Sequence, residues 1–157
     1  MDVMLALYKS FILPHLENCS PLLLGVGKVQ ANKIEDANHY ILRTLTGHGK
    51  SLSYQELLNI CKLDNWECRK KQQSLILLFK CIRDIEPKYN RDFLSIRETS
   101  YNLRVNGVNL CVPKFNLNFM RNSFNYKCAQ LWNKLPEDVK LADNVNIFKS
   151  KLRSTQL

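Results

Sequence analysis

One long segment with helical periodicity constrains the fold of this chain more than any other feature. Between about residue 65 and residue 85, apolar side chains recur at spacings of three and four, at Leu75, Leu78, Phe79 and Ile82. This spacing places them on one face of an α-helix, and Pro87 marks its end because proline cannot continue a helix. An apolar face of this length must be buried. The sequence therefore predicts a central helix against which other segments pack.

Two helices are expected before this central helix. Residues 3–13 are apolar on nearly every side at helical spacing, and Pro14 is expected to interrupt them. Residues 28–46 have one apolar face that ends before Gly47, a typical helix stop. Because a helix that is apolar all round is normally buried, we expect a further part of a larger protein to pack on residues 3–13.

Shorter helices are expected just before the central helix and again after it. Ser53 and Glu56 have the spacing of a capping box, which predicts a helix from there to about residue 61. Residues 123–135 return to a helical pattern, and Pro136 followed by two acidic residues is typical of a helix start. A last helix is predicted from about residue 144.

The stretch between the central and the C-terminal helices has a different pattern. Helical periodicity fades from residue 97 to about residue 122. Apolar and other side chains alternate at 110–112 and 115–119 as in short strands, and Asn106–Gly107 suits a tight turn. We therefore expect a mainly α fold with a small β-hairpin between the central long helix and the C-terminal helices. Two regions, 1–95 and 96–157, are predicted, with one continuous domain as the alternative.

The positive charge of the chain is confined to its second part. The formal net charge of the 157 residues is +9. Residues 1–65 hold six basic and six acidic side chains, whereas residues 66–157 hold 17 basic and eight acidic ones. Such an excess favours a polyanionic partner. The competing interpretation is that the additional Lys and Arg serve solubility.

No catalytic centre is visible. The chain has no Asp–Asp pair, no Walker-type loop, no G-x-S-x-G and no dinucleotide fingerprint. Its six cysteines form no C-x-x-C pair, and its three histidines are scattered. We therefore expect no catalytic residue, no metal site, no cofactor and no small-molecule substrate.

No membrane or export signal is visible either. Lys9 breaks the N-terminal apolar stretch, and the longest purely apolar run, at 21–27, is far too short to span a bilayer. The expected protein has no membrane association and is intracellular, in the cytoplasm or nucleus, with reduced thiols.

Candidate phosphate contacts come from two patterns. On the central helix, spacings of 11 and 14 place Arg69, Lys80 and Arg83 near one azimuth, opposite the apolar face, although a solvated face is an equally good interpretation. Farther along, basic residues are interleaved with aromatic ones that either stack on bases or form a local core, the second being favoured for Phe124 and Trp132. The predicted nucleic-acid-binding residues are Arg69, Lys80, Arg83, Arg104, Lys114, Arg121 and Lys127.

Several phrases together resemble a known family. Residues 7–19 (LYKSFILPHLENC) are similar to the L-Y-x-S-x-I-x-P-H…C segment that follows the polymerase core in non-LTR (LINE-type) retrotransposon reverse transcriptases. The segments 34–47, 53–69 and 79–89 resemble the next parts of that family in order. Its closing S-F…W-N-x-L-P…F-K-x-x-L block is matched at Ser123, Phe124, Trp132, Asn133, Leu135, Pro136, Phe148, Lys149 and Leu152.

The resemblance implies a thumb and post-thumb region of a reverse transcriptase, an RNA-directed DNA polymerase. The palm with its catalytic aspartates is absent from the chain, so the Mg²⁺ of polymerisation is expected only in that missing part. Leu22–Gly25 stands where the family often has Trp-Gly, and His39–Arg43 replaces an R-A-L-R phrase. The implied role is an accessory one, contact with the backbone of RNA or a DNA–RNA hybrid as template–primer. The missing palm and fingers are the implied partner of residues 3–13.

Two other interpretations stay open. The chain is alternatively a helical protein-interaction module that docks through Leu5, Tyr8, Phe11 and Ile12. It is also compatible with a decayed reading frame that has no activity.

Overall fold

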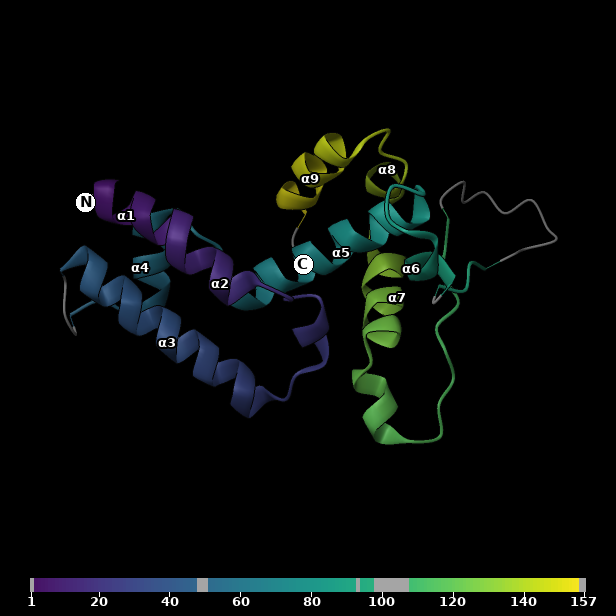
Figure 1. Ribbon diagram of the computed structural model, residues 1–157, viewed down its shortest axis with the longest axis horizontal. Helices are drawn as coiled ribbons and strands as arrows, with labels where there is room; N and C mark the ends of the chain where they lie inside the picture. Colours follow the sequence, from purple (N-terminus) through teal and green to yellow (C-terminus); the bar gives the residue numbers. More distant parts are fainter. Residues whose placement is uncertain (1, 48–50, 93, 98–107, 156–157) are drawn as a thin grey trace. The chain divides into compact units, whose positions relative to one another are not determined.

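The computed structural model describes residues 2–47, 51–92, 94–97 and 108–155, and these are mainly helical (Figure 1). The chain divides into two compact units, Met1–Lys70 (unit 1) and Lys71–Leu157 (unit 2). The division falls within the long helix α5, Trp66–Ile82, whereas the boundary expected at 95–96 lies inside unit 2. Within the described ranges, no helix has both the length and the apolar character needed to cross a membrane.

Unit 1 begins with a continuous helical rod. It consists of α1 (Asp2–Leu7), a π-helical turn η1 (Tyr8–Ile12) and α2 (Leu13–Glu17), and it runs alongside α3 in Figure 1. The expected interruption at Pro14 is therefore wrong. Pro14 lies in the first turn of α2, directly after the wider π turn, and the helical backbone continues through it.

Two further helices of unit 1 confirm local signals in the sequence. After a short 3₁₀ turn, Leu22–Gly25, helix α3 spans Lys28–Thr46 and ends at Gly47, whose φ of 70° is the left-handed conformation that favours glycine. Helix α4 (Tyr54–Cys61) begins with the predicted capping box. The Ser53 N–H donates to Glu56 Oε2 at 2.7 Å, and the Glu56 N–H donates to Ser53 Oγ at 3.3 Å.

The core of unit 1 is formed where the helical rod, α3 and α4 meet. Its fully buried members are Tyr8, Leu42, Leu57, Leu58 and Cys61. Trp66, at the start of α5, is buried as well. The side chains that the sequence spaces at helical intervals thus supply the core of this unit.

Unit 2 is built around the C-terminal part of α5. It also contains α6 (Lys88–Asp92), the 3₁₀ turn η3 (Asn118–Asn122), α7 (Phe124–Lys134), α8 (Glu137–Lys140) and α9 (Val145–Ser154). The predicted apolar face of α5 is confirmed, with Leu75, Leu78 and Phe79 buried. The ring of Phe79 stacks on that of Phe148 in α9 at a centroid distance of 4.3 Å, and Trp132 of α7 lies against the same Phe148 ring at 6.0 Å.

Helix termini in unit 2 also follow the sequence. Ser123 caps α7, and Asn144 caps α9 by accepting a hydrogen bond from the Ile147 N–H at 2.9 Å. Helix α5 ends at Ile82, before Pro87 is reached, because Asp84 adopts a left-handed φ of 55° and the Ile85 N–H closes onto the Lys80 carbonyl at 2.9 Å.

The small β-hairpin is the part of the fold prediction that the structure corrects. Among the described residues there is no strand, only one isolated antiparallel bridge between Ile96 and Leu110. Residues 115–119 form no strand, since the 3₁₀ turn η3 begins at Asn118. The predicted turn at Asn106–Gly107 lies outside the described residues.

A side-chain amide occupies the edge of Leu110 that faces away from Ile96, since the bridge itself is held by the main-chain groups of Asn109 and Cys111. Asn133 of α7 accepts from the Leu110 N–H at 2.9 Å and donates to the Leu110 carbonyl at 2.8 Å. The indole N–H of Trp132 donates to the Val108 carbonyl at 2.7 Å. Helix α7 therefore occupies the outer edge of residues 108–110, where a further strand on that side would otherwise pair.

Candidate nucleic-acid interface

The charge of the chain is distributed unequally between the two units. Residues 1–70 hold eight basic and seven acidic side chains, whereas residues 71–157 hold 15 basic and seven acidic ones. Unit 1 is thus nearly neutral, and unit 2 carries the excess. Unit 2 is therefore the part of the chain expected to attract a polyanion.

Arg69 has to be withdrawn from the predicted contacts. It is only 8% exposed, its Nη1 donates to the Asp64 carbonyl at 3.0 Å, and its Nε lies 2.8 Å from Glu17 Oε1. The pairing with Glu17 is electrostatic, because neither of these two atoms makes a well-aligned hydrogen bond. Helical azimuth places Arg69 opposite the apolar stripe, but α2 covers that side of the helix at this point.

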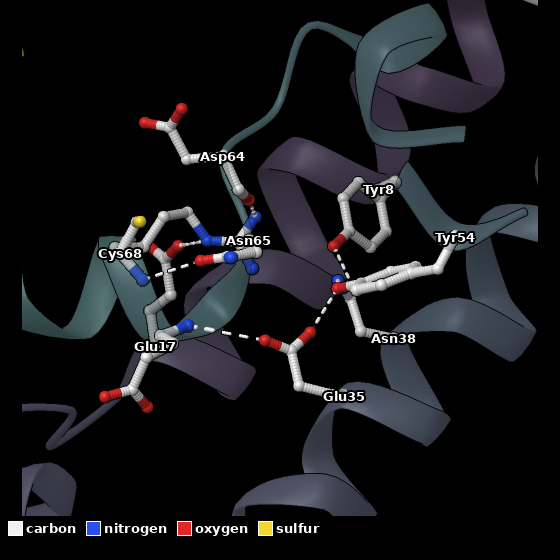
Figure 2. A network of polar contacts seen from close by, with 10 residues as sticks. Tyr8, Glu17, Glu35, Asn38, Tyr54, Asp64, Asn65 and Cys68 are labelled. Atoms are coloured by element: carbon white, nitrogen blue, oxygen red, sulfur yellow. Dashed lines mark hydrogen bonds and ion pairs between the residues drawn. The ribbon is translucent and has the colours of Figure 1, made fainter. Parts of the chain in front are cut away.

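Arg69 interacts with Tyr8, which belongs to a polar network that joins the helices of unit 1 (Figure 2). The Tyr8 hydroxyl donates to Asn38 Oδ1, and Asn38 Nδ2 donates to the Tyr54 hydroxyl at 2.7 Å. The Tyr54 hydroxyl in turn donates to Glu35, whose other oxygen accepts from the Glu67 N–H at 3.3 Å. The network links η1, α3, α4 and the start of α5, so its polar groups are satisfied within the unit.

The pKa values in this network reflect burial. Burial raises the pKa of Tyr8, and the nearby Arg69 guanidinium offsets part of that rise. Burial also raises the pKa of Glu17, again opposed by Arg69. For Tyr54, burial and the hydrogen bond that it donates to Glu35 raise the pKa far above its ordinary value. These tyrosines stay protonated at physiological pH, which suits a structural role.

Lys80 of α5 and Arg83, which directly follows that helix, make contacts within the protein. Lys80 is half-buried, and its Nζ forms an ion pair with Glu86 at 3.0 Å. The exposed Arg83 donates through Nη2 to the Ala142 carbonyl at 2.7 Å, with its guanidinium carbon 5.5 Å from the centre of the Phe79 ring. Both residues add positive potential to unit 2, but the Lys80 ammonium and the Arg83 Nη2 already have partners within the protein.

The clearest exposed basic surface is formed by residues 114–121, which we call the 114–121 segment. Lys114 and Arg121 are exposed, and neither forms an ion pair within the described part of the chain. Between them, the side chains of Leu117 and Phe119 are 59% and 68% exposed. Exposed cations and an exposed aromatic ring therefore occur within eight residues of sequence, in a segment that leads through η3 into α7 (Figure 1).

The remaining predicted contacts divide as follows. Lys127 of α7 is half-buried and has contacts within the protein. Arg104 lies outside the described residues. Among the neighbouring aromatics, Phe115 lies against Tyr126, with ring centroids 6.2 Å apart, and Trp132 is buried as expected.

A second basic surface was not among the predicted contacts. An open depression of about 540 Å³ lies over one face of α9, lined by Asn146, Lys149, Ser150, Arg153 and Ser154. Their spacing of three and four along α9 is the signal from which this face is predictable. Two cations, an amide and two hydroxyls suit contact with phosphate oxygens.

In the described ranges, no three His, Cys, Asp or Glu side chains gather closely enough to hold a metal ion. The chain matches no protein-family model, and comparison with curated proteins and with solved structures likewise gives no match. The resemblance to reverse transcriptases thus stays a prediction from the sequence.

Proposed function

We propose that the chain is an accessory nucleic-acid-binding region of the kind that follows the polymerase core in non-LTR reverse transcriptases. It contacts the backbone of RNA or a DNA–RNA hybrid, carries no polymerase chemistry of its own, and acts inside the cell. The observation that supports it best is the charge excess of unit 2 together with the exposed Lys114 and Arg121.

The proposed mechanism is neutralisation of phosphate charge. Lysine and arginine side chains at a polyanion surface displace condensed counterions, so affinity falls as salt rises. Lys114, Arg121, Lys149 and Arg153 supply this contact. Lys80, Arg83 and Lys127 contribute mainly to the field of unit 2, since each has contacts within the protein.

The salt dependence of binding tests this function. Affinity of the full chain for a labelled RNA–DNA hybrid is measured by fluorescence anisotropy between about 50 and 200 mM salt. We expect log affinity to fall linearly with log salt, and the double variant K114A/R121A to lower that slope by roughly two. The matched control K28A/K33A removes two exposed cations from α3 in unit 1 and leaves the slope unchanged.

Salt-independent affinity contradicts the proposal. A loss of slope in K28A/K33A equal to that in K114A/R121A also contradicts it, because binding is then not located in unit 2.

One observation favours a second candidate, a helical protein-interaction module. Val3 and Phe11 on the N-terminal rod are 74% and 67% exposed, and Met4 and Leu7 are exposed beside them. The expected docking face of Leu5, Tyr8, Phe11 and Ile12 needs correction, because Tyr8 is fully buried and Leu5 packs against the core, while Phe11 and Ile12 are exposed. The exposed face is instead formed by Val3, Met4, Leu7, Phe11 and Ile12. It is the surface on which the missing palm and fingers are proposed to pack.

Capture experiments separate the two candidates. A protein-interaction module retains a stoichiometric protein partner that L7E/F11E loses, and it shows no retention on heparin. If the chain is a decayed reading frame, no protein is detectable in cells.

A further inference from the structure

The 114–121 segment presents one of its two phenylalanine rings, that of Phe119, to solvent. Phe119 is 68% exposed, although the neighbouring Phe115 lies against Tyr126, and Phe79, Trp132 and Phe148 pack together in the core. Its two flanking cations, Lys114 and Arg121, are exposed as well. An exposed aromatic ring with exposed cations within five residues on either side of it in the sequence has the chemistry of a base-stacking platform.

From this arrangement we infer that the 114–121 segment binds an unpaired nucleic-acid strand, with one base stacked on Phe119 and neighbouring phosphates held by Lys114 and Arg121. The inference rests on the proposed function and makes it more specific. It names a single strand as the ligand, whereas backbone contact alone suits a duplex equally well.

Hydrogen bonds fix the backbone that carries Phe119. The Met120 N–H donates to the Leu117 carbonyl at 3.1 Å, and the Ser123 N–H donates to the Met120 carbonyl at 3.0 Å. Ser123 then caps α7 through the Tyr126 N–H at 3.4 Å. Phe119 therefore belongs to a hydrogen-bonded turn anchored to a helix, which lowers the entropy lost when a base stacks on it.

A duplex does not make use of this ring. In double-stranded RNA or a hybrid, each base face is covered by its neighbours, and proteins contact chiefly phosphates and 2′-hydroxyls. An unpaired strand exposes base faces, so only there does Phe119 add to affinity. An anionic membrane is the less favoured partner, because interfacial binding needs an amphipathic helix with a broad apolar face, and η3 has five residues.

The test compares ligands that share charge but differ in exposed bases. The full chain and F119A are titrated with oligo(U) of about 12 nucleotides, an RNA–DNA hybrid of the same length, heparin, and phosphatidylserine vesicles. F119W serves as the conservative variant. L141A, which shortens another exposed apolar side chain of unit 2, is the matched control.

We expect F119A to bind oligo(U) about 5- to 150-fold more weakly, with an unchanged salt slope because no charge is removed. Its affinity for the hybrid and for heparin stays at the wild-type value. F119W restores oligo(U) affinity, and L141A changes none of these values. Unchanged far-UV circular dichroism of F119A excludes misfolding as the cause.

The outcomes separate the inference from the proposed function. If F119A binds oligo(U) as tightly as the wild type while salt-dependent binding persists, the inference is overturned and the proposed function stands. If no nucleic acid binds in a salt-dependent way, the proposed function itself fails, and the inference with it. If F119A loses affinity for vesicles alone, the segment is a membrane contact and the inference is overturned.

Discussion

The guanidinium of Arg83 donates a hydrogen bond to the main-chain carbonyl of Ala142, which ties the end of α5 to the connection between α8 and α9 at an Nη2–O distance of 2.7 Å. The side chain of Ala142 is buried, so this carbonyl belongs to a packed part of unit 2. Arg83 thus has a structural role, its hydrogen bond to Ala142, and an electrostatic role through its charge. This relationship allows its two roles to be measured separately.

Replacing Arg83 by Ala is expected to lower the free energy of unfolding by about 1–2 kcal/mol, because a charged donor is removed from a main-chain acceptor. Urea denaturation followed by circular dichroism measures the change. Lys80→Ala on α5 is the control. Its partly exposed ion pair with Glu86 is expected to contribute less than about 1 kcal/mol. Equal losses in the two variants contradict a structural role for the Arg83 hydrogen bond.

Asn38 is expected to be the most sensitive polar position of unit 1. It is fully buried, accepts from the Tyr8 hydroxyl and donates to that of Tyr54. Asn38→Leu leaves both hydroxyls without these partners and should lower the free energy of unfolding by about 2–4 kcal/mol. Asn59→Leu, at an exposed position of α4, should change it by less than about 0.5 kcal/mol. A tolerated Asn38→Leu variant would show that the network does not stabilise the unit.

The capping box predicts an acid-dependent loss of stability. The hydrogen bonds that Ser53 donates, first from its main-chain N–H, hold the pKa of Glu56 below its ordinary value of 4.5. A carboxyl with a lowered folded-state pKa stabilises the fold above its unfolded pKa, and this contribution is lost as pH falls through the folded pKa. Glu56→Gln should therefore be less sensitive to acid than the wild type, as measured by urea midpoints between about pH 7 and about pH 3.

Glu17 is expected to change the stability with pH in the direction opposite to Glu56. Burial raises the pKa of Glu17, so the folded chain binds the proton of this carboxyl more tightly than the unfolded chain does. Its contribution is present at low pH and declines as pH rises from 4.5 through the folded pKa. Wild-type stability relative to Glu17→Gln should fall over that window. A rise there contradicts the assignment of burial as the dominant influence on Glu17.

Lys140 and Lys114 should separate stability from binding. Lys140 is buried, and its Nζ donates to Asn109 Oδ1 at 3.1 Å and to the Asn133 carbonyl at 3.2 Å. Lys140→Ala is expected to cost about 1–3 kcal/mol of stability without changing the salt slope of nucleic-acid binding. The exposed Lys114→Ala is expected to do the reverse, leaving stability unchanged and lowering the slope by about one. The reverse pattern in these two variants would falsify the placement of the interface.

Local signals in the sequence predicted the helices well. Gly47 and the Ser53–Glu56 pair mark helix ends through interactions between residues close in sequence, and both are present. The hairpin prediction was wrong, and it also missed that the amide of Asn133 pairs with the main chain of Leu110 on the edge where a further strand would lie. No alternation of apolar residues reveals such a distant partner.

The candidate interface was predictable only in part. Helical azimuth identifies the side of α5 on which Arg69 lies, but it does not reveal that Glu17 and Asp64 occupy that side. The exposure of Phe119 was equally hidden, since the sequence alone does not separate a stacking ring from a core ring such as Trp132. The distribution of charge along the sequence predicts the basic region. Tertiary packing determines which side chains of that region face the solvent.

The placement of the two buried tryptophans has a practical consequence. The chain has two tryptophans, Trp66 in unit 1 and Trp132 in unit 2. Each unit therefore contains one intrinsic fluorophore, and Trp→Phe substitution of either leaves the other as a reporter of its own unit. The emission of the two single-tryptophan chains then records whether the neutral and the basic unit melt at one temperature or at two.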